Sequence, residues 1–282
     1  MTRRTLLVIG PMVAFSAWVA VQTLSPTKLV LIGRDGTRTV LGDVPSDTFS
    51  PRLSPDGQHV SFQAGGAAWV ADIHDLASRR QFKPIRSVTF PVWRDTSRLV
   101  FIGTQDQPAL YSAATTDDKA DLLAGVARAP DGWSDANNGV SFITLNGDDY
   151  DIWFYSAATK RVLPLVVIPG SRQLSSQISP DGKWIAYKSD ETGAFEVWVQ
   201  PFPTGSRVQV TRTGGRNPRW SPDGRELFFD DDHQIFGMRV TSEVPLAFSS
   251  PVALSVKGFV QAGSLRRQWD VTSDGRFLVL MR

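Results

Sequence analysis

The stretch SPDGKWIAYKSDETGAFEVWVQPFP (residues 179–203) contains the pattern that decides the fold. It begins with a Ser-Pro-Asp-Gly turn, in which Pro presets φ, Asp bonds nearby backbone N–H groups and Gly adopts the positive φ that leaves the turn. Two short runs of alternating apolar and polar residues follow, at 184–188 and 195–201. Such alternation is typical of strands that bury one face, so the stretch predicts a β-hairpin.

The same turn, followed by an apolar strand, recurs along the chain. Intact copies lie at 54–57 and 221–224, a variant copy (TSDG) lies at 272–275, and degenerate copies lie at 94–97 and 134–137. The six aspartates are spaced by 39 to 51 residues: Asp56, Asp95, Asp135, Asp181, Asp223 and Asp274. One short strand precedes each turn and further strands follow it. Four antiparallel strands in a unit of about 40–50 residues are typical of a propeller blade.

The two ends of the chain complete this pattern. The last unit stops at Arg282 after two strands, whereas residues 28–33 and 37–42 form two strands that belong to no other unit. We therefore predict an all-β, six-bladed β-propeller over residues 27–282, with four antiparallel strands per blade. Strands from both termini close the last blade, which leaves no open sheet edge.

Residues 1–25 have a different character. Arg3 and Arg4 precede an apolar run from Thr5 to Val21, which is the arrangement of an export signal. The run has 17 residues, and a membrane span needs about 20, so a cleaved signal peptide and a retained N-terminal anchor both stay open. Either one places the propeller outside the cytoplasm, in the periplasm or anchored to the inner membrane and facing the periplasm. Membrane contact is expected only through this segment.

Charge and composition exclude several functions. The chain has 30 Lys and Arg against 28 Asp and Glu, and without Arg3 and Arg4 the two counts are equal. No basic block or recognition motif is present, so nucleic-acid binding is not expected. There is no Cys, which excludes disulfides, thiolate metal sites and cysteine catalysis. His59, His74 and His233 fall on different parts of their blades, and we expect neither a metal nor a cofactor.

The repeat resembles that of the TolB-type six-bladed propeller family. Residues 179–203 and NPRWSPDGRELFF (217–229) carry the likeness most strongly, and it covers all six units although the second and third are degenerate. The chain is also similar to the extracytoplasmic propellers of bacterial serine/threonine kinases. The resemblance implies extracytoplasmic protein–protein interaction or sensing, but such a repeat specifies a fold more than a function. The kinase motifs and the G-x-S-x-G nucleophile elbow are missing.

Several conspicuous residues are expected to be structural. The turn residues should stabilise their own turns, with a cation site at the ring centre as the alternative: Asp56, Gly57, Asp181, Gly182, Asp223, Gly224, Asp274 and Gly275. Tryptophans in two repeated registers should fill the core between blades, with exposed stacking on a sugar or peptide as the alternative: Trp93, Trp133, Trp220, Trp69, Trp153 and Trp198. The acidic clusters at 148–151 and 230–232 lack the ligand set of a calcium loop and should be solvated.

Arginines between the blades form the candidate binding site. The connections from a fourth strand to the next first strand should lie on one face, near the channel mouth, and they contain Arg86, Arg128, Arg172, Arg216 and Arg266, with Arg267 beside the last. The loops after the second strands should open on that face and carry Asp106, Asp148, Asp190 and Asp231. Guanidinium groups bind carboxylates and phosphates. The mouth therefore suits an acidic peptide of an envelope protein or a small anionic ligand. Coincidence, or pairing with the acidic loops, is the alternative.

The leading functional hypothesis is a non-catalytic propeller, exported to the bacterial cell envelope, that acts as a protein-interaction or ligand-sensing module. The first alternative is a propeller enzyme, such as a lyase, lactonase or glycosidase, with a carboxylate-based site in the central channel. The second is the sensor domain of a larger signalling complex, which a retained anchor would favour. We expect a monomer and no catalytic residue.

Overall fold

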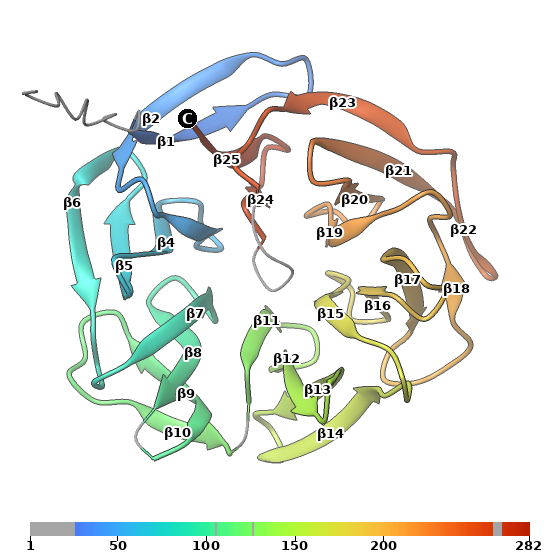
Figure 1. Cartoon of the computed structure of the whole chain (residues 1–282), viewed down its shortest axis with the longest axis horizontal. Helices are drawn as coiled ribbons and strands as arrows, with labels where there is room; N and C mark the ends of the chain where they lie inside the picture. The colour runs from blue at the N-terminus through green and yellow to red at the C-terminus, as the bar shows by residue number, and fades with distance from the viewer. Residues whose placement is uncertain (1–25, 105, 126, 262–266) are drawn as a thin grey trace, which may run out of the picture.

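The computed structural model describes residues 26–104, 106–125, 127–261 and 267–282. Every regular element in these segments is a β-strand, and the strands form six sheets arranged as blades around a central axis (Figure 1). The predicted all-β, six-bladed propeller is therefore confirmed. None of these segments forms a helix with the length and hydropathy of a membrane span. The predicted signal or anchor, residues 1–25, lies outside the described residues.

Four blades are continuous in sequence, and each runs from an inner strand at the axis to an outer strand at the rim. The first contains β3 (Phe49–Leu53), β4 (His59–Ala64), β5 (Ala67–Asp72) and β6 (Asp75–Phe82). The second contains β7 (Val88–Trp93), β8 (Arg98–Thr104), β9 (Pro108–Ala114) and β10 (Asp121–Ala124). The third contains β11 (Ala129–Ser134), β12 (Gly139–Asn146), β13 (Asp149–Ser156) and β14 (Arg161–Val166). The fourth contains β15 (Gln173–Ile178), β16 (Trp184–Ser189), β17 (Glu196–Pro201) and β18 (Val208–Gln209).

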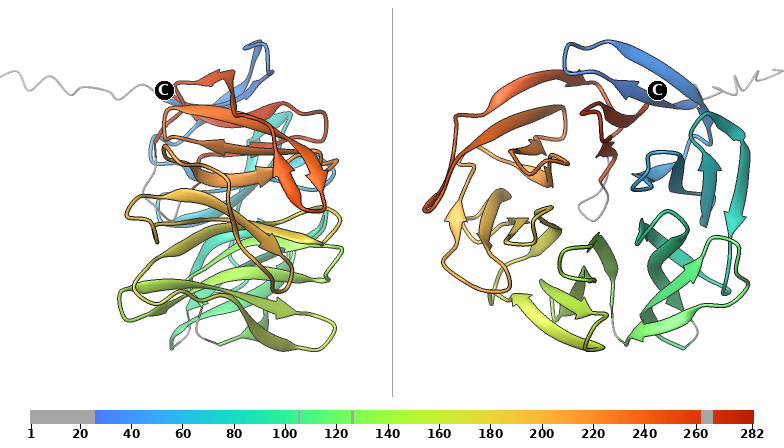
Figure 2. Two further views of the ribbon diagram at one scale, coloured as in Figure 1. Left: turned by 90° about the vertical axis from the view of Figure 1, so that its right-hand side faces the viewer. Right: turned by 180° about the vertical axis from the view of Figure 1, so that it is seen from behind.

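The last two blades depart from this simple order. The fifth contains β19 (Arg216–Trp220), β20 (Glu226–Asp230), β21 (Gln234–Glu243) and β22 (Leu246–Phe248), and β23 (Val252–Lys257) also pairs with β21. The sixth joins β24 (Trp269–Val271) and β25 (Phe277–Met281) to β1 (Thr27–Ile32) and β2 (Arg38–Val44), in the order β2-β1-β25-β24. Lys28 lies opposite Met281 in this sheet. Strands from both ends of the chain thus close the ring, as predicted (Figure 2).

The repeated turn follows from the bonds of its own side chains. In the copy that begins at Ser179, Gly182 N–H donates to the Ser179 carbonyl at 2.9 Å, and φ of Gly182 is 76°. Ser179 Oγ–H donates to Asp181 Oδ1 at 2.6 Å, and the same oxygen accepts from Lys183 N–H at 3.1 Å. The carboxylate therefore stabilises the turn into β16.

The hydrophobic core lies between the blades. It consists of six clusters, and each cluster joins residues of two neighbouring blades. Trp93 and Trp220 are buried in these clusters, and Trp69, Trp133, Trp153 and Trp198 pack against them partly buried. The repeated tryptophans thus fill inter-blade space, because large aromatic side chains contribute the most buried apolar area there.

Candidate functional site

Four of the predicted arginines lie on one face of the ring, which we call the arginine face: Arg86, Arg128, Arg172 and Arg216. Each stands at, or within two residues before, the first residue of an inner strand. Each continuous blade has four antiparallel strands in chain order, so the chain leaves the outer strand on the same face on which it entered the inner strand. Every inner strand of these blades therefore begins on the same face. The first three side chains are exposed and that of Arg216 is half-buried. Arg266 lies outside the described residues.

Two of these arginines contact the acidic loops. Arg172 Nε pairs with Asp190 Oδ2 at 2.7 Å, and Arg216 Nε pairs with Asp232 Oδ2 at 3.2 Å. Both guanidinium groups also stack over the ring of Phe195, at 5.0 and 5.4 Å from its centroid. Pairing with the acidic loops therefore occurs in the fourth and fifth blades. In contrast, Arg86 and Arg128 make no ion pair within the described segments.

A buried polar layer lies beneath this part of the arginine face. The Lys188 side chain is 1% exposed and its Nζ lies 5.1 Å from the centre of the Phe195 ring. Burial lowers the pKa of Lys188 to about 8. Asp230, also 1% exposed, accepts hydrogen bonds from Trp269 Nε1 at 2.6 Å and Asn217 Nδ2 at 3.0 Å, and burial raises its pKa. The layer thus holds charged groups that are almost fully removed from water.

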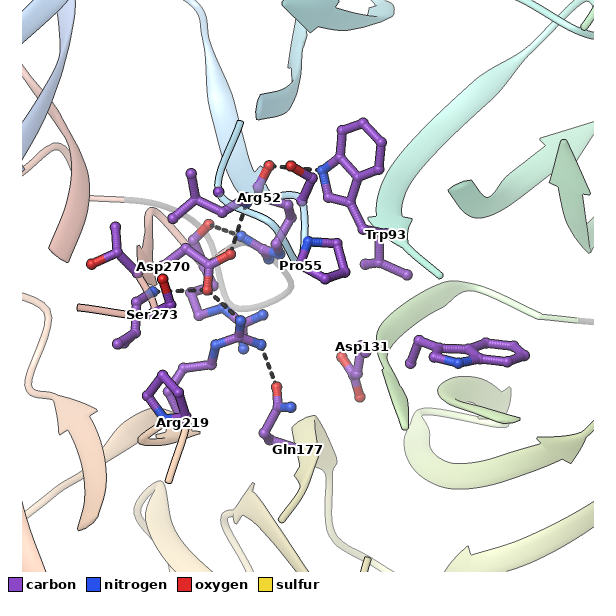
Figure 3. Close-up of a pocket in the computed structure, with 18 residues that line it drawn as sticks. Arg52, Pro55, Trp93, Asp131, Gln177, Arg219, Asp270 and Ser273 are labelled. Atoms are coloured by element: carbon purple, nitrogen blue, oxygen red, sulfur yellow. Dashed lines mark hydrogen bonds and ion pairs between the residues drawn. The ribbon is translucent and has the colours of Figure 1, made fainter. Parts of the chain in front are cut away.

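A second charged site lies inside the central channel, close to the opposite mouth, where the repeated turns lie. A cavity of about 210 Å³ opens there between the blades (Figure 3). Its charged and amide-bearing lining comes from five blades: Arg52, Asp131, Gln177, Arg219, Arg267 and Asp270. These residues, which we call the channel cluster, were not predicted as a site, although Arg267 was noted beside Arg266.

One ion pair organises the channel cluster. Arg219 Nη2 lies 2.5 Å from Asp270 Oδ1, and its Nη1 donates to Gln177 Oε1. Asp270 also accepts backbone N–H bonds from Leu53 at 3.0 Å and from Val271 at 2.9 Å. Burial raises the pKa of Asp270, but the positive charge of Arg219 and its arginine neighbours outweighs burial and leaves the pKa below its usual value.

The other carboxylate of the cluster has different partners. Asp131 Oδ2 accepts from Ser176 N–H at 2.8 Å and from Ser176 Oγ–H at 2.6 Å. Burial raises the pKa of Asp131. Arg52 Nη1 donates to the carbonyl oxygens of Pro51 at 2.7 Å and Arg267 at 3.1 Å. Asp131 and Arg52 therefore both form their hydrogen bonds with neutral groups.

A repeated distortion of the inner strands shapes the channel wall. Four residues at one repeat position have a left-handed backbone, with φ from 50° to 55°: Ser50, Phe90, Ser175 and Asn217. The strand register shifts at each of them, which is the mark of a β-bulge. Side-chain oxygens bond the N–H groups of two of these residues, Gln268 for Ser50 and Gln63 for Phe90, each at 2.9 Å. Such strain costs about 1–3 kcal/mol per residue and tends to cluster at functional sites.

A sequence signal for the channel cluster exists in the repeat itself. Arg52, Arg219 and Asp270 each stand two residues before the first turn residue of their copy. Polar and charged residues at the same position of an inner strand face the axis together. Among the described residues, no three His, Asp or Glu side chains lie close enough to hold a metal ion.

Comparisons with known proteins support the fold. No family model matches the chain, and no curated protein matches it either. Its structure is similar to that of a putative TolB from Agrobacterium tumefaciens, with a TM-score of 0.72, 17% identity, and coverage of 91% of this chain and 98% of that one. TolB from Acinetobacter baumannii gives a TM-score of 0.61 and 17% identity over 80% of this chain and 63% of that one. An oligogalacturonate lyase in complex with manganese gives a TM-score of 0.58 and 14% identity over 90% of this chain and 82% of that one. The chain thus has the six-bladed propeller fold seen in TolB.

Proposed function

Starting from a TolB-like propeller fold, we propose that the chain is an exported, non-catalytic binding module that takes an acidic segment of a cell-envelope protein on its arginine face. One observation carries the proposal. Four consecutive blades each have an arginine at or just before the start of the inner strand, so the arginines recur from blade to blade on one face. Planar guanidinium forks bind carboxylates with two parallel hydrogen bonds, which suits a run of Asp and Glu side chains.

The ion pairs already present on this face do not block such binding. The Arg172 side chain is 47% exposed even though it pairs with Asp190. An exposed pair of this kind is worth only about 0–1 kcal/mol, so a partner carboxylate can replace or join it. Arg86 and Arg128, whose side chains are exposed, leave two further guanidinium groups for a partner.

The alternative is a propeller enzyme with a carboxylate in the channel. Structural similarity to oligogalacturonate lyase supports the shared fold, and at 14% identity it carries no activity to this chain. Asp270 is a poor general base, because Arg219 and two backbone N–H groups bond it and its pKa is lowered. The bonding of Asp270 therefore counts against a general-base role for this carboxylate.

The location of the protein is part of the same proposal. Residues 1–25 would export the chain or anchor it to the inner membrane, and residues 27–282 would fold in the periplasm. Sequencing the N-terminus of the mature protein from membrane and soluble fractions distinguishes the two forms. A mature N-terminus near residue 26 supports a cleaved signal, and an intact Met1 or Thr2 in the membrane fraction supports a retained anchor and a sensor role.

A capture experiment tests the binding role. The tagged full-length protein is incubated with native envelope extract beside two variants, Arg172→Ala/Arg216→Ala and the control Arg161→Ala. Arg161 lies exposed on the outer strand β14, so the control removes a guanidinium far from the mouth. We expect a protein that wild type and control retain and that the double variant loses, with an unchanged melting temperature. Equal capture by the folded double variant would contradict the proposal.

A further inference from the structure

Two guanidinium groups in the channel have no carboxylate partner. Arg267 is 3% exposed, and its buried Nε has no hydrogen-bond partner within the described segments. The buried Nε of Arg52 is also without a partner there, and the Arg52 bonds that exist go to carbonyl oxygens. Neither group lies within ion-pair distance of an Asp or Glu of the described chain. Both residues line the 210 Å³ cavity.

The carboxylates of the cluster attract both guanidinium groups but offset their charge only in part. Asp270 already pairs with Arg219 and accepts two backbone hydrogen bonds. Asp131 is bonded by the N–H and hydroxyl groups of Ser176. Three guanidinium groups and two carboxylates line the cavity, so its wall carries an excess of positive charge even with both carboxylates ionised.

Burying this excess positive charge is costly. A buried charge without a counter-charge loses its hydration and gains nothing in return. Burial lowers the pKa of Arg52 to about 10 and lowers that of Arg267 well below its usual value. Arginine nevertheless stays protonated in proteins, so an anion bound in the cavity would compensate the remaining positive charge.

We propose that the channel cavity binds a small anion whose carboxylate or phosphoryl oxygens accept hydrogen bonds from Arg267 and Arg52. The volume suits such a ligand, since about 210 Å³ corresponds to roughly seven water volumes of about 30 Å³. Trp93 and Trp133 also line the cavity and add apolar surface for a short carbon skeleton. This site faces the mouth opposite the arginine face, so it is independent of the proposed partner binding.

Titration calorimetry on the full-length protein tests the site. The probes are inorganic phosphate and succinate, each compared with sodium chloride at the same ionic strength. We expect saturable binding of one anion per chain, and the tighter of the two probes identifies phosphoryl or carboxylate chemistry. No saturable binding of either probe beyond the chloride control would overturn the proposal.

The Arg267→Met variant separates a ligand site from a structural role. The variant should bind about tenfold more weakly or worse, because a charged hydrogen bond is lost. Its melting temperature without ligand should rise, since an uncompensated buried charge has been replaced by an apolar side chain of similar length. The control Arg161→Met should change neither quantity. Unchanged affinity in Arg267→Met would overturn the proposal.

A second variant keeps the test decisive if Arg267→Met fails to fold. Asp131→Asn keeps an oxygen that can accept from Ser176 N–H but removes a negative charge from the cavity wall. Anion binding should tighten several-fold, and weaker or unchanged binding would overturn the proposal. Capture of an envelope protein through the arginine face should stay unaltered in both variants, so failure of one proposal does not imply failure of the other.

Discussion

An aspartate at the repeated turn has a role that depends on its neighbours. Asp223 accepts hydrogen bonds from Ser221 Oγ–H at 2.6 Å and Arg225 N–H at 3.0 Å, and these bonds lower its pKa. In the degenerate copy, Ser134 Oγ–H instead donates to Asn137 at 2.9 Å. Asp135 contributes only its backbone carbonyl, which accepts from Asn138 N–H. Asp223 is the third residue of its turn and Asp135 the second of its copy, so aspartate stabilises one turn with its side chain and not the other.

This difference predicts the outcome of two matched substitutions. Asp223→Ala should lower the free energy of unfolding by about 1 kcal/mol, because two turn hydrogen bonds are lost. Asp135→Ala should leave that free energy unchanged within about 0.5 kcal/mol, as expected for an exposed site without such bonds. Urea unfolding followed by tryptophan fluorescence measures both. Equal losses in the two variants would contradict the assignment.

A pH-dependent effect is expected at Lys188. Its pKa is about 8 when folded and 10.5 as the reference for the unfolded chain. Between pH 8 and pH 10.5 the unfolded state binds more protons than the folded state, so the free energy of unfolding rises with pH. The buried lysine therefore destabilises the fold most below pH 8, and this destabilisation disappears as the pH rises towards 10.5. The difference in unfolding free energy between Lys188→Met and wild type should therefore fall by about 2 kcal/mol from pH 7 to pH 10. A difference that is constant with pH would contradict the lowered pKa.

At the scale of the element, the sequence predicts strands and turns well, because their signals are local. The turn residues and the alternation around Ser179 and Ser221 suffice to place β16 and β20. The inner-strand bulges have no such signal. Ser50, Phe90 and Asn217 share a left-handed backbone but no residue type. Side chains distant in sequence accept from the N–H groups of Ser50 and Phe90. Some residues of the channel cluster do recur two positions before the turn, but the cluster itself assembles only when five blades meet at the axis.

Gly139, the first residue of β12, allows a test of how tightly one blade is packed. A Cβ added there would lie 2.3 Å from both the Tyr155 carbonyl oxygen and Phe154 Cζ. Gly139→Ala should therefore lower the free energy of unfolding by about 1–3 kcal/mol through overpacking. The control Gly125→Ala, where a Cβ would meet nothing within 4 Å, should have no such cost. Thermal unfolding of both variants measures the difference, and equal stabilities would contradict it.

At the scale of the whole molecule, stability depends on closing the ring. We propose that residues 27–282 fold without the N-terminal segment and unfold in one cooperative transition. A chain of residues 45–282 lacks β1 and β2, which leaves β24 and β25 as an isolated pair with an open edge. Two-stranded sheets are marginal in water and open edges promote association. The shorter chain should aggregate on size-exclusion chromatography, and a monomer with the same melting temperature as 27–282 would contradict this.

The closing sheet also determines how the molecule would respond to mechanical load. β1 and β25 are antiparallel, and Lys28 near the chain's start lies opposite Met281 near its end. A force pulling the two termini apart therefore acts on this first residue pair alone, then on Leu29 and Leu280, and so on along the ladder. The strands would peel apart one pair at a time, without the resistance of a ladder sheared along its length. Tension between the termini would thus open the sixth blade first and turn a closed ring into an open arc.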